Sequence, residues 1–283
     1  MEFARTRRQF ETILSINKTT GNTDTGILCS YPLRAVERAF LLPPKKEITM
    51  PNEILLLLSF LVIYGGALLA YRMFGTVGLY GVSALATVVA NIEVMIVVDA
   101  FGLEQTLGNV LFGVTFLITD ILSENEGKQQ ANKAVNLGIF ASLFFLVISQ
   151  SWLLYTPAAN DWAMPSFRSL FSNTPRMLFA SLSVYAISQK FDVWLYHKWW
   201  ELTARKSGDG RRFLWLRNNG STLISQLMNA VLFNLIAFVG TYDGRTLLSI
   251  ILSSYLIYVF TSLMDTPFVY LARRMKEKGL VPQ

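Results

Sequence analysis

The sequence carries very little charge. Only 16% of its 283 residues are Asp, Glu, Lys or Arg, whereas a typical soluble protein has about 25%. Apolar residues make up 52%, and a surface exposed to water needs more charge than this composition supplies. The same apolar content excludes an intrinsically disordered chain. The composition therefore predicts a membrane protein with several spans.

Cysteine and histidine are almost absent, with Cys29 and His197 each standing alone. One cysteine excludes a disulfide scaffold, and one residue of each type is too few for a zinc site. The sequence also has no nucleophile motif, no dinucleotide fingerprint and no phosphate-binding loop. We therefore expect neither an enzyme nor a resident metal or cofactor.

Long apolar runs are plentiful. A transmembrane helix needs about 18 or more predominantly apolar residues. Seven regions reach or approach this length, at roughly 54–71, 77–98, 107–122, 136–155, 176–197, 221–240 and 246–271. The sequence thus predicts an all-α, polytopic membrane protein with about seven transmembrane helices, located in the plasma membrane.

Basic residues predict the orientation, because short cytoplasmic loops carry an excess of Lys and Arg. We expect a cytoplasmic loop over 196–219 and a cytoplasmic C-terminus, and the two spans between them make these assignments agree. Counting back along the chain places the start of the first span outside. The basic residues behind these assignments are Lys198, Arg205, Lys206, Arg211, Arg212 and Arg217 in the loop and Arg273, Arg274, Lys276 and Lys278 in the tail. We interpret them as orientation signals, not as a nucleic-acid surface.

Residues 1–49 conflict with this orientation. They contain eight Lys and Arg residues, yet the predicted topology places them outside. Initiation at Met50 would remove the conflict, because the remaining tail before the first span has no basic residue. We expect 1–49 to be a non-native or disordered extension and 50–283 to form a single integral membrane domain.

Polar residues follow one face of the sixth apolar region. Thr222, Ser225, Gln226 and Asn229 have helical spacing, and Asn218 extends the row by one turn. A polar stripe on a spanning helix has to face protein or water. Hydrogen bonds between helices, worth about 0.6 kcal/mol each on average, are one interpretation. Five polar residues in one stripe favour the other interpretation, a cavity.

Acidic residues also lie in or near the apolar regions, where they are costly. Asp120 and Asp265 lie toward the predicted cytoplasmic ends of the third and seventh regions. Asp192 lies late in the fifth, where the open interpretations are an ion pair with Lys190 or Lys198, placement at the membrane interface, or a functional role. Such groups are candidates for a transport site.

Several blocks together resemble one family. They are 90–94 (ANIEV), 107–113 (LGNVLFG), 120–124 (DILSE), 187–194 (ISQKFDVW) and 216–226 (LRNNGSTLISQ). In order and spacing they resemble the queuosine precursor transporter family, formerly the putative vitamin uptake transporters, over about 52–275. The chain is similar to the longer version of that family, in which one extra span precedes a six-helix core.

The resemblance implies import of a 7-deazaguanine-type base, the precursor of queuosine in tRNA. A guanine-like edge presents adjacent donors to a carboxylate, and an amide both donates and accepts. The implied partners are this small nucleobase-like molecule and the lipid bilayer, with a homo-oligomer or a coupling subunit left open, and no nucleic acid. The substrate-binding residues expected on this basis are Asn91, Asp120, Glu124, Gln189, Asp192, Asn218, Thr222, Gln226 and Asn229.

Two points stay open in the sequence. Where the family usually carries an Asp-Thr pair, this chain has Asn229 and Ala230, which implies a difference in ligand or in coupling. The alternative function is that of a substrate-binding subunit of an energy-coupling-factor transporter for a vitamin-like or nucleobase-like molecule. That subunit would need a separate ATPase module.

Overall fold

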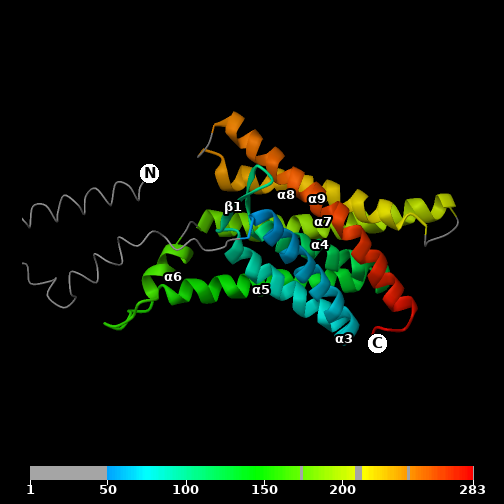
Figure 1. Ribbon diagram of the computed structural model, residues 1–283, viewed down its shortest axis with the longest axis horizontal. Coiled ribbons are helices and arrows are strands. Elements are labelled where there is room, and N and C mark those ends of the chain that lie inside the picture. Colours follow the sequence, from blue (N-terminus) through cyan, green and yellow to red (C-terminus); the bar gives the residue numbers. More distant parts are fainter. Residues whose placement is uncertain (1–49, 173–174, 208–211, 241–242, 283) are drawn as a thin grey trace, which may run out of the picture. The chain divides into compact units, whose positions relative to one another are not determined.

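The computed structural model describes residues 50–172, 175–207, 212–240 and 243–282. Within these ranges the regular elements are helices apart from one short hairpin, in agreement with the all-α prediction (Figure 1). The expected extension over 1–49 lies outside the described residues. The elements are α3 (Asn52–Glu93), β1 (Val97–Ala100), β2 (Leu103–Thr106), α4 (Gly108–Asn125), α5 (Lys128–Trp152), α6 (Met164–Phe171), α7 (Pro175–Ser207), α8 (Leu214–Phe238) and α9 (Gly244–Glu277).

Helix α3 consists of two arms that meet at Gly75. The backbone there has φ 61° and ψ −142°, a conformation that glycine adopts far more readily than other residues. The chain reverses at this point, because the two far ends of the arms meet again. Asn52 Nδ2 donates to the Asp99 carbonyl oxygen at 2.9 Å, and the Phe101 amide donates to Glu53 Oε1 at 3.2 Å. The arms correspond to the first two predicted spans.

The second arm ends earlier than predicted. The apolar run continues to residue 98, but the helix ends at Glu93, and the next residues pair as the antiparallel strands β1 and β2. Phe101 and Gly102 connect the strands with φ values of 53° and 74°, and positive φ at both central residues is typical of a two-residue hairpin turn. The segment 99–106, which lies between the second and third predicted spans, is therefore mostly hairpin.

Helix α4 is the central helix. Every residue from Gly113 to Ser123 is buried, and α4 contacts α3, α5, α7 and α9. Helices α7 and α8 form another extensive pair, as do α8 and α9, which lie side by side in Figure 1. A helix that is buried on all sides needs small or apolar neighbours. Gly113, on α4 itself, lets α3 come close, because a Cβ at this position would lie 2.5 Å from the Tyr64 hydroxyl.

Connections gather at two ends of the bundle. At the hairpin end, defined by β1 and β2, the end of α3 lies near α6, and the hairpin lies near the ends of α8 and α9. At the Gly75 end, Gly75 lies against Pro282, and Glu126 binds both Tyr71 and Lys276. At the hairpin end Asp243 caps α9, and hydrogen bonds from the Thr246 hydroxyl and nearby backbone amides lower the pKa of this carboxyl.

Within the part of the chain that the structure describes, four helices are long and apolar enough to cross a membrane by length and composition: α3, α5, α8 and α9. The count of seven spans is therefore not established by these criteria. The loop expected over 196–219 is wrong in extent, since α7 continues to Ser207 and α8 begins at Leu214. The basic residues in that region lie mostly on helices that extend past their apolar parts.

Candidate functional site

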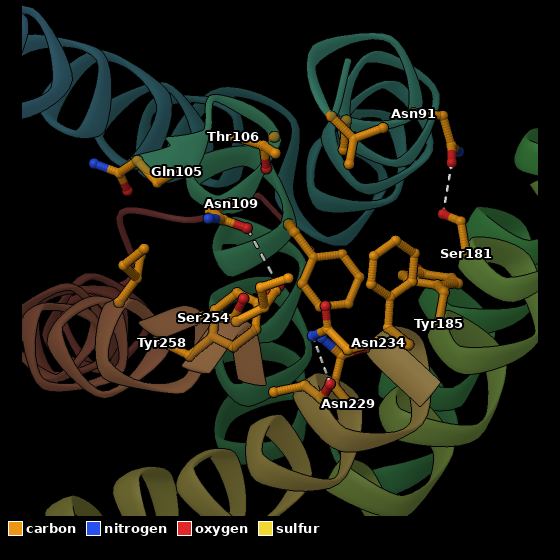
Figure 2. Close-up of a pocket in the computed structure, with 18 of the residues that line it drawn as sticks. Asn91, Gln105, Thr106, Asn109, Ser181, Tyr185, Asn229, Asn234, Ser254 and Tyr258 are labelled. Atoms are coloured by element: carbon orange, nitrogen blue, oxygen red, sulfur yellow. Dashed lines mark hydrogen bonds between the residues drawn. The ribbon is translucent and has the colours of Figure 1, made fainter. Parts of the chain in front are cut away.

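A large cavity lies toward the hairpin end. Its volume is about 440 Å³, within the range of small-molecule sites. Residues from α3, β2, α4, α5, α7, α8 and α9 form its walls (Figure 2). Ligand sites between the helices of a bundle are common, so the position fits a binding site.

The cavity wall is mostly apolar and carries polar side chains that are uncharged. Among the described residues, no Asp, Glu, Lys or Arg lines it. Amides, hydroxyls and aromatic rings alternate around it, and Figure 2 labels the polar ones. The amides are Asn91, Gln105, Asn109, Asn229 and Asn234, and the principal hydroxyls and rings are Ser181, Ser254, Tyr185, Tyr258, Phe112 and Phe233.

Hydrogen bonds position several of these groups. Ser181 Oγ donates to Asn91 Oδ1 at 2.8 Å, which links α7 to α3. The Tyr258 hydroxyl donates to Asn109 Oδ1 at 3.3 Å, which links α9 to α4. Asn91 Nδ2 donates back to the Thr87 carbonyl oxygen. The Tyr185 hydroxyl is buried near Gly138 on α5, and the Tyr185 side chain also lines the cavity.

A polar layer lies below the cavity, toward the Gly75 end. It contains Asp120 from α4, Asp192 from α7 and Asp265 from α9, each with no exposed surface. Thr222 Oγ1 donates to Asp120 Oδ2 at 3.1 Å, and Ser225 Oγ donates to Asp192 Oδ1 at 2.7 Å. The stripe on α8 thus connects carboxyl groups of two other helices.

Gln189 also belongs to this layer, and both polar atoms of its side-chain amide form hydrogen bonds. Its Nε2 donates to Thr115 Oγ1 at 2.6 Å, and its Oε1 accepts from Thr119 Oγ1 at 3.3 Å. Both hydroxyls lie on α4, so Gln189 joins α7 to the central helix. Gln226 differs, because neither of its side-chain polar atoms has a partner although the residue is completely buried.

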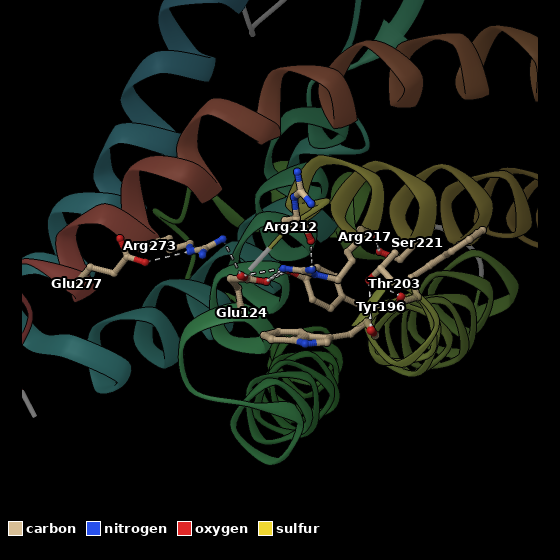
Figure 3. Close-up of polar contacts among 10 residues, drawn as sticks. Glu124, Tyr196, Thr203, Arg212, Arg217, Ser221, Arg273 and Glu277 are labelled. Carbon is tan, nitrogen blue, oxygen red and sulfur yellow. Dashed lines mark hydrogen bonds and ion pairs between the residues drawn. The ribbon is translucent and has the colours of Figure 1, made fainter. Parts of the chain in front are cut away.

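Glu124 lies further from the cavity than the polar layer does, in an ion-pair cluster at the Gly75 end (Figure 3). Arg217 Nη2 lies 2.8 Å and Arg273 Nη1 lies 3.3 Å from its carboxylate, and the Tyr196 hydroxyl donates to it at 2.6 Å. The Arg217 guanidinium also lies 4.4 Å from the centre of the Trp200 ring, a cation–π contact. This cluster joins α4, α7, α8 and α9.

The predicted site residues therefore fall into three levels. Asn91 and Asn229 line the cavity. The polar layer holds Asp120, Gln189, Asp192, Thr222 and Gln226, with Asn218 one turn further on α8, where its Nδ2 donates to Thr266 Oγ1. Glu124 belongs to the ion-pair cluster.

The ion pair considered for Asp192 is wrong. Lys190 Nζ donates to Asn136 Oδ1, and Lys198 pairs with Glu201 at 3.3 Å. Asp192 instead receives the Ser225 hydroxyl. Both interpretations of the α8 stripe hold in part, since Asn229 lines the cavity while Thr222 and Ser225 bond to neighbouring helices.

Sequence reasoning missed much of the cavity wall. Asn109 and Asn234 are amides within apolar segments, and the high cost of polar groups there was the signal that could have found them. Tyr185, Tyr258 and Phe112 gave no such signal, because an aromatic residue in a membrane helix looks the same whether it packs against a helix or lines a cavity.

Comparison with known proteins finds relatives of this chain. A sequence model described as putative vitamin uptake transporter matches residues 106–272. A protein of Bacillus subtilis (strain 168), named probable queuosine precursor transporter, is 39% identical over 208 residues. The alignment covers 74% of this chain and 89% of that protein. No solved structure matches the chain.

Proposed function

The chain belongs to the putative vitamin uptake transporter family, a family of transporters and not of enzymes, and we propose that it carries a queuosine precursor across a membrane. The relative from Bacillus subtilis supports this function over most of the length of both chains. Residues 106–272, which match the family, contain α4 to α8 and most of α9, the helices that contribute most of the cavity wall.

The observation that carries the proposal is the uncharged cavity ringed by amides and aromatic residues. A nucleobase-like ligand is planar and presents donors and acceptors along its edges. Amide side chains such as Asn91 and Asn229 supply both donors and acceptors, while rings such as Tyr185 and Phe112 supply stacking surfaces. We assign the base to this cavity, with its edge toward the amides.

The wall also favours a neutral base. A cationic ligand loses hydration when it enters a site, and only an opposite charge or several strong hydrogen bonds restore that loss. The cavity offers no carboxylate among the described residues. A base without an ionised amine is therefore the preferred ligand, and Asn229 is the position at which a carboxylate would change this preference.

Seven passes through the plasma membrane fit the arrangement. The two arms of α3 and the helices α4, α5, α7, α8 and α9 each run between the hairpin end and the Gly75 end. The described basic residues Arg212, Arg273, Arg274, Lys276 and Lys278 gather at the Gly75 end. By the excess of Lys and Arg on the cytoplasmic side, we place the Gly75 end and the C-terminus in the cytoplasm and the cavity toward the outside.

Two barriers then separate the cavity from the cytoplasm. The polar layer lies one to two helical turns below the cavity, and the ion-pair cluster around Glu124 lies below that. Carriers expose one site to the two sides alternately. The described conformation corresponds to a site facing outward with its inner side closed by the Glu124 cluster.

Rescue of queuosine in tRNA tests the function. A bacterial strain that cannot make the precursor and lacks its own importer receives this gene and a low external concentration of precursor. We expect queuosine to return in tRNA with the parental chain and with Lys198→Ala, an exposed control. We expect Asn91→Ala to weaken the rescue. Absence of queuosine despite normal amounts of protein in the membrane would overturn the proposed function.

A further inference from the structure

Three buried carboxyl groups converge in the polar layer. Thr222 and Ser225 are neighbours on one face of α8, and they bind Asp120 and Asp192 respectively. The two carboxyls therefore lie within about one helical turn of each other. Asp265 on α9 interacts electrostatically with both. Each of the three side chains has no exposed surface.

No described base neutralises this group. Arg217 pairs with Glu124, and Lys190 and Lys198 bind elsewhere. The other titratable groups that face the three carboxyls are Tyr64 on α3, which faces Asp265, Tyr196 on α7, which faces Asp120, and Glu124 itself. None of these neighbours supplies a positive charge.

Charge alone therefore argues for a bound cation. Placing an ionised carboxylate in a dry interior costs several kcal/mol unless a positive charge compensates it, and like charges side by side add to the cost. Asp120 and Asp192 each leave one oxygen without a hydrogen bond, and Asp265 leaves both. A proton on one of these oxygens removes a charge and creates a donor for a neighbour.

Gln226 provides a second, independent observation. The residue is completely buried, and neither its amide nitrogen nor its amide oxygen has a hydrogen-bond partner. It lies four residues after Thr222 and beside Ser225, so it lies on the side of α8 that faces the carboxyls. An unpaired buried amide of this kind is unfavourable, because folding removes it from water without giving it a new partner. Such an amide accepts from a protonated carboxyl and donates to an ionised one.

The arrangement points to a proton and not to a metal ion. Among the residues that the structure describes, no group of three or more His, Cys, Asp or Glu side chains has the geometry to hold a metal. Hydroxyl and amide neighbours are instead the partners that a carboxylic acid uses when it gains or loses a proton.

We propose that Asp120, Asp192 and Asp265 with Gln226 form a proton-binding site that couples proton entry to uptake of the base. The proposal rests on the transport function proposed above. Helix α8 provides the connection, because Asn229 lines the cavity and Gln226 lies one turn below it. Helix α9 provides another, because Tyr258 lines the cavity and Asp265 lies about 10 Å further along the helix. Filling the cavity and binding the proton therefore act on the same two helices.

Uptake into proteoliposomes tests the coupling. The purified chain is reconstituted, labelled precursor is added outside, and the outer buffer is made more acidic than the lumen by one pH unit. We expect up to about tenfold accumulation if one proton enters together with each base, and a protonophore should abolish it. Asp120→Asn, Asp192→Asn and Asp265→Asn should each lose the accumulation. The matched control Asp243→Asn, at the exposed cap of α9, should keep it.

The outcomes separate the two proposals. Uptake that ignores the proton gradient would overturn the proton site and leave the transport function standing. Cluster variants that elute normally in gel filtration and still accumulate the base with the gradient would overturn it as well. Complete absence of uptake by the parental chain would count against the transport function instead.

Infrared spectroscopy tests the proton site without transport. A carboxyl group that holds a proton in the dry interior has a C=O stretching band that ionised carboxylates lack. We expect this band in the purified parental protein and in Asp243→Asn at neutral pH. It should be reduced in at least one of Asp120→Asn, Asp192→Asn and Asp265→Asn. Absence of the band from the parental protein would overturn the proposal.

Discussion

Arg217 and Glu124 form an ion pair in the interior of the bundle. One guanidinium nitrogen, Nη2, lies 2.9 and 2.8 Å from the two carboxylate oxygens, and the Arg217 side chain is completely buried (Figure 3). A buried charge that loses its partner destabilises a protein by about 3–5 kcal/mol. The pair therefore matters for holding α4 and α8 together.

The first prediction concerns this pair. Arg217→Met should lower the free energy of unfolding by about 3–5 kcal/mol, because the buried charge of Glu124 keeps only Arg273 as a cationic partner. The matched control is Lys198→Met, which breaks the exposed pair with Glu201 and should cost no more than about 1 kcal/mol. Thermal unfolding in detergent measures both. Equal stability of the two variants would contradict the structural role of the pair.

The second prediction concerns the reversal in α3. Gly75→Ala should destabilise the protein by about 1–3 kcal/mol, because its φ of 61° is unfavourable for alanine. A Cβ there would also lie 2.7 Å from the Pro282 carbonyl oxygen. The control Gly81→Ala adds a Cβ that meets nothing within 4 Å and should be neutral or stabilising by up to about 1 kcal/mol. Equal stability of the two variants in thermal unfolding would contradict this role of Gly75.

The third prediction concerns ligand charge. Asn229→Asp places a carboxylate in the wall of an otherwise uncharged cavity, and a hydrogen bond to a charged group is worth about 1.5–3 kcal/mol. The ratio of uptake of an amine-bearing 7-deazaguanine to that of a neutral one should rise by about tenfold or more. Competition between the two compounds measures the ratio. Asn132→Asp, on α5 and outside the cavity, is the control, and an unchanged ranking in Asn229→Asp would contradict the assignment of the cavity.

The fourth prediction concerns orientation. Cys29 is the single cysteine of the chain, so Cys29→Ser gives a background for adding one label site at a time. Asp161→Cys, before α6, and Lys278→Cys, after α9, place exposed thiols beyond the helices at opposite ends. A maleimide that cannot cross membranes should label Asp161→Cys in intact cells and Lys278→Cys only after permeabilisation. The reverse pattern would contradict the proposed orientation.

Sequence patterns predicted the helices well because the physical constraint is simple. Every backbone group in a bilayer needs an internal partner, so each apolar run became a helix. The ends were less accurate, since helices continue into water where hydropathy no longer marks them. Helix α7 continues through Trp199 to Ser207, and the sequence alone suggested a loop there.

The site was only partly predictable. The spacing of Thr222, Ser225, Gln226 and Asn229 placed them on one buried face, and the structure confirms their burial. The position of each residue relative to the cavity was harder to predict, because spacing along one helix does not say which of its turns meets a cavity and which meets another helix. Asn229 lines the cavity, while Thr222, two turns away, bonds to Asp120.

Uptake by the purified chain alone is the most direct test of the central claim. The protein is reconstituted into liposomes without any other subunit, and the entry of labelled queuosine precursor is followed over time. The account predicts saturable uptake that unlabelled precursor inhibits and that empty liposomes lack. No uptake by a correctly inserted protein, or uptake only after an ATPase module is added, would contradict it.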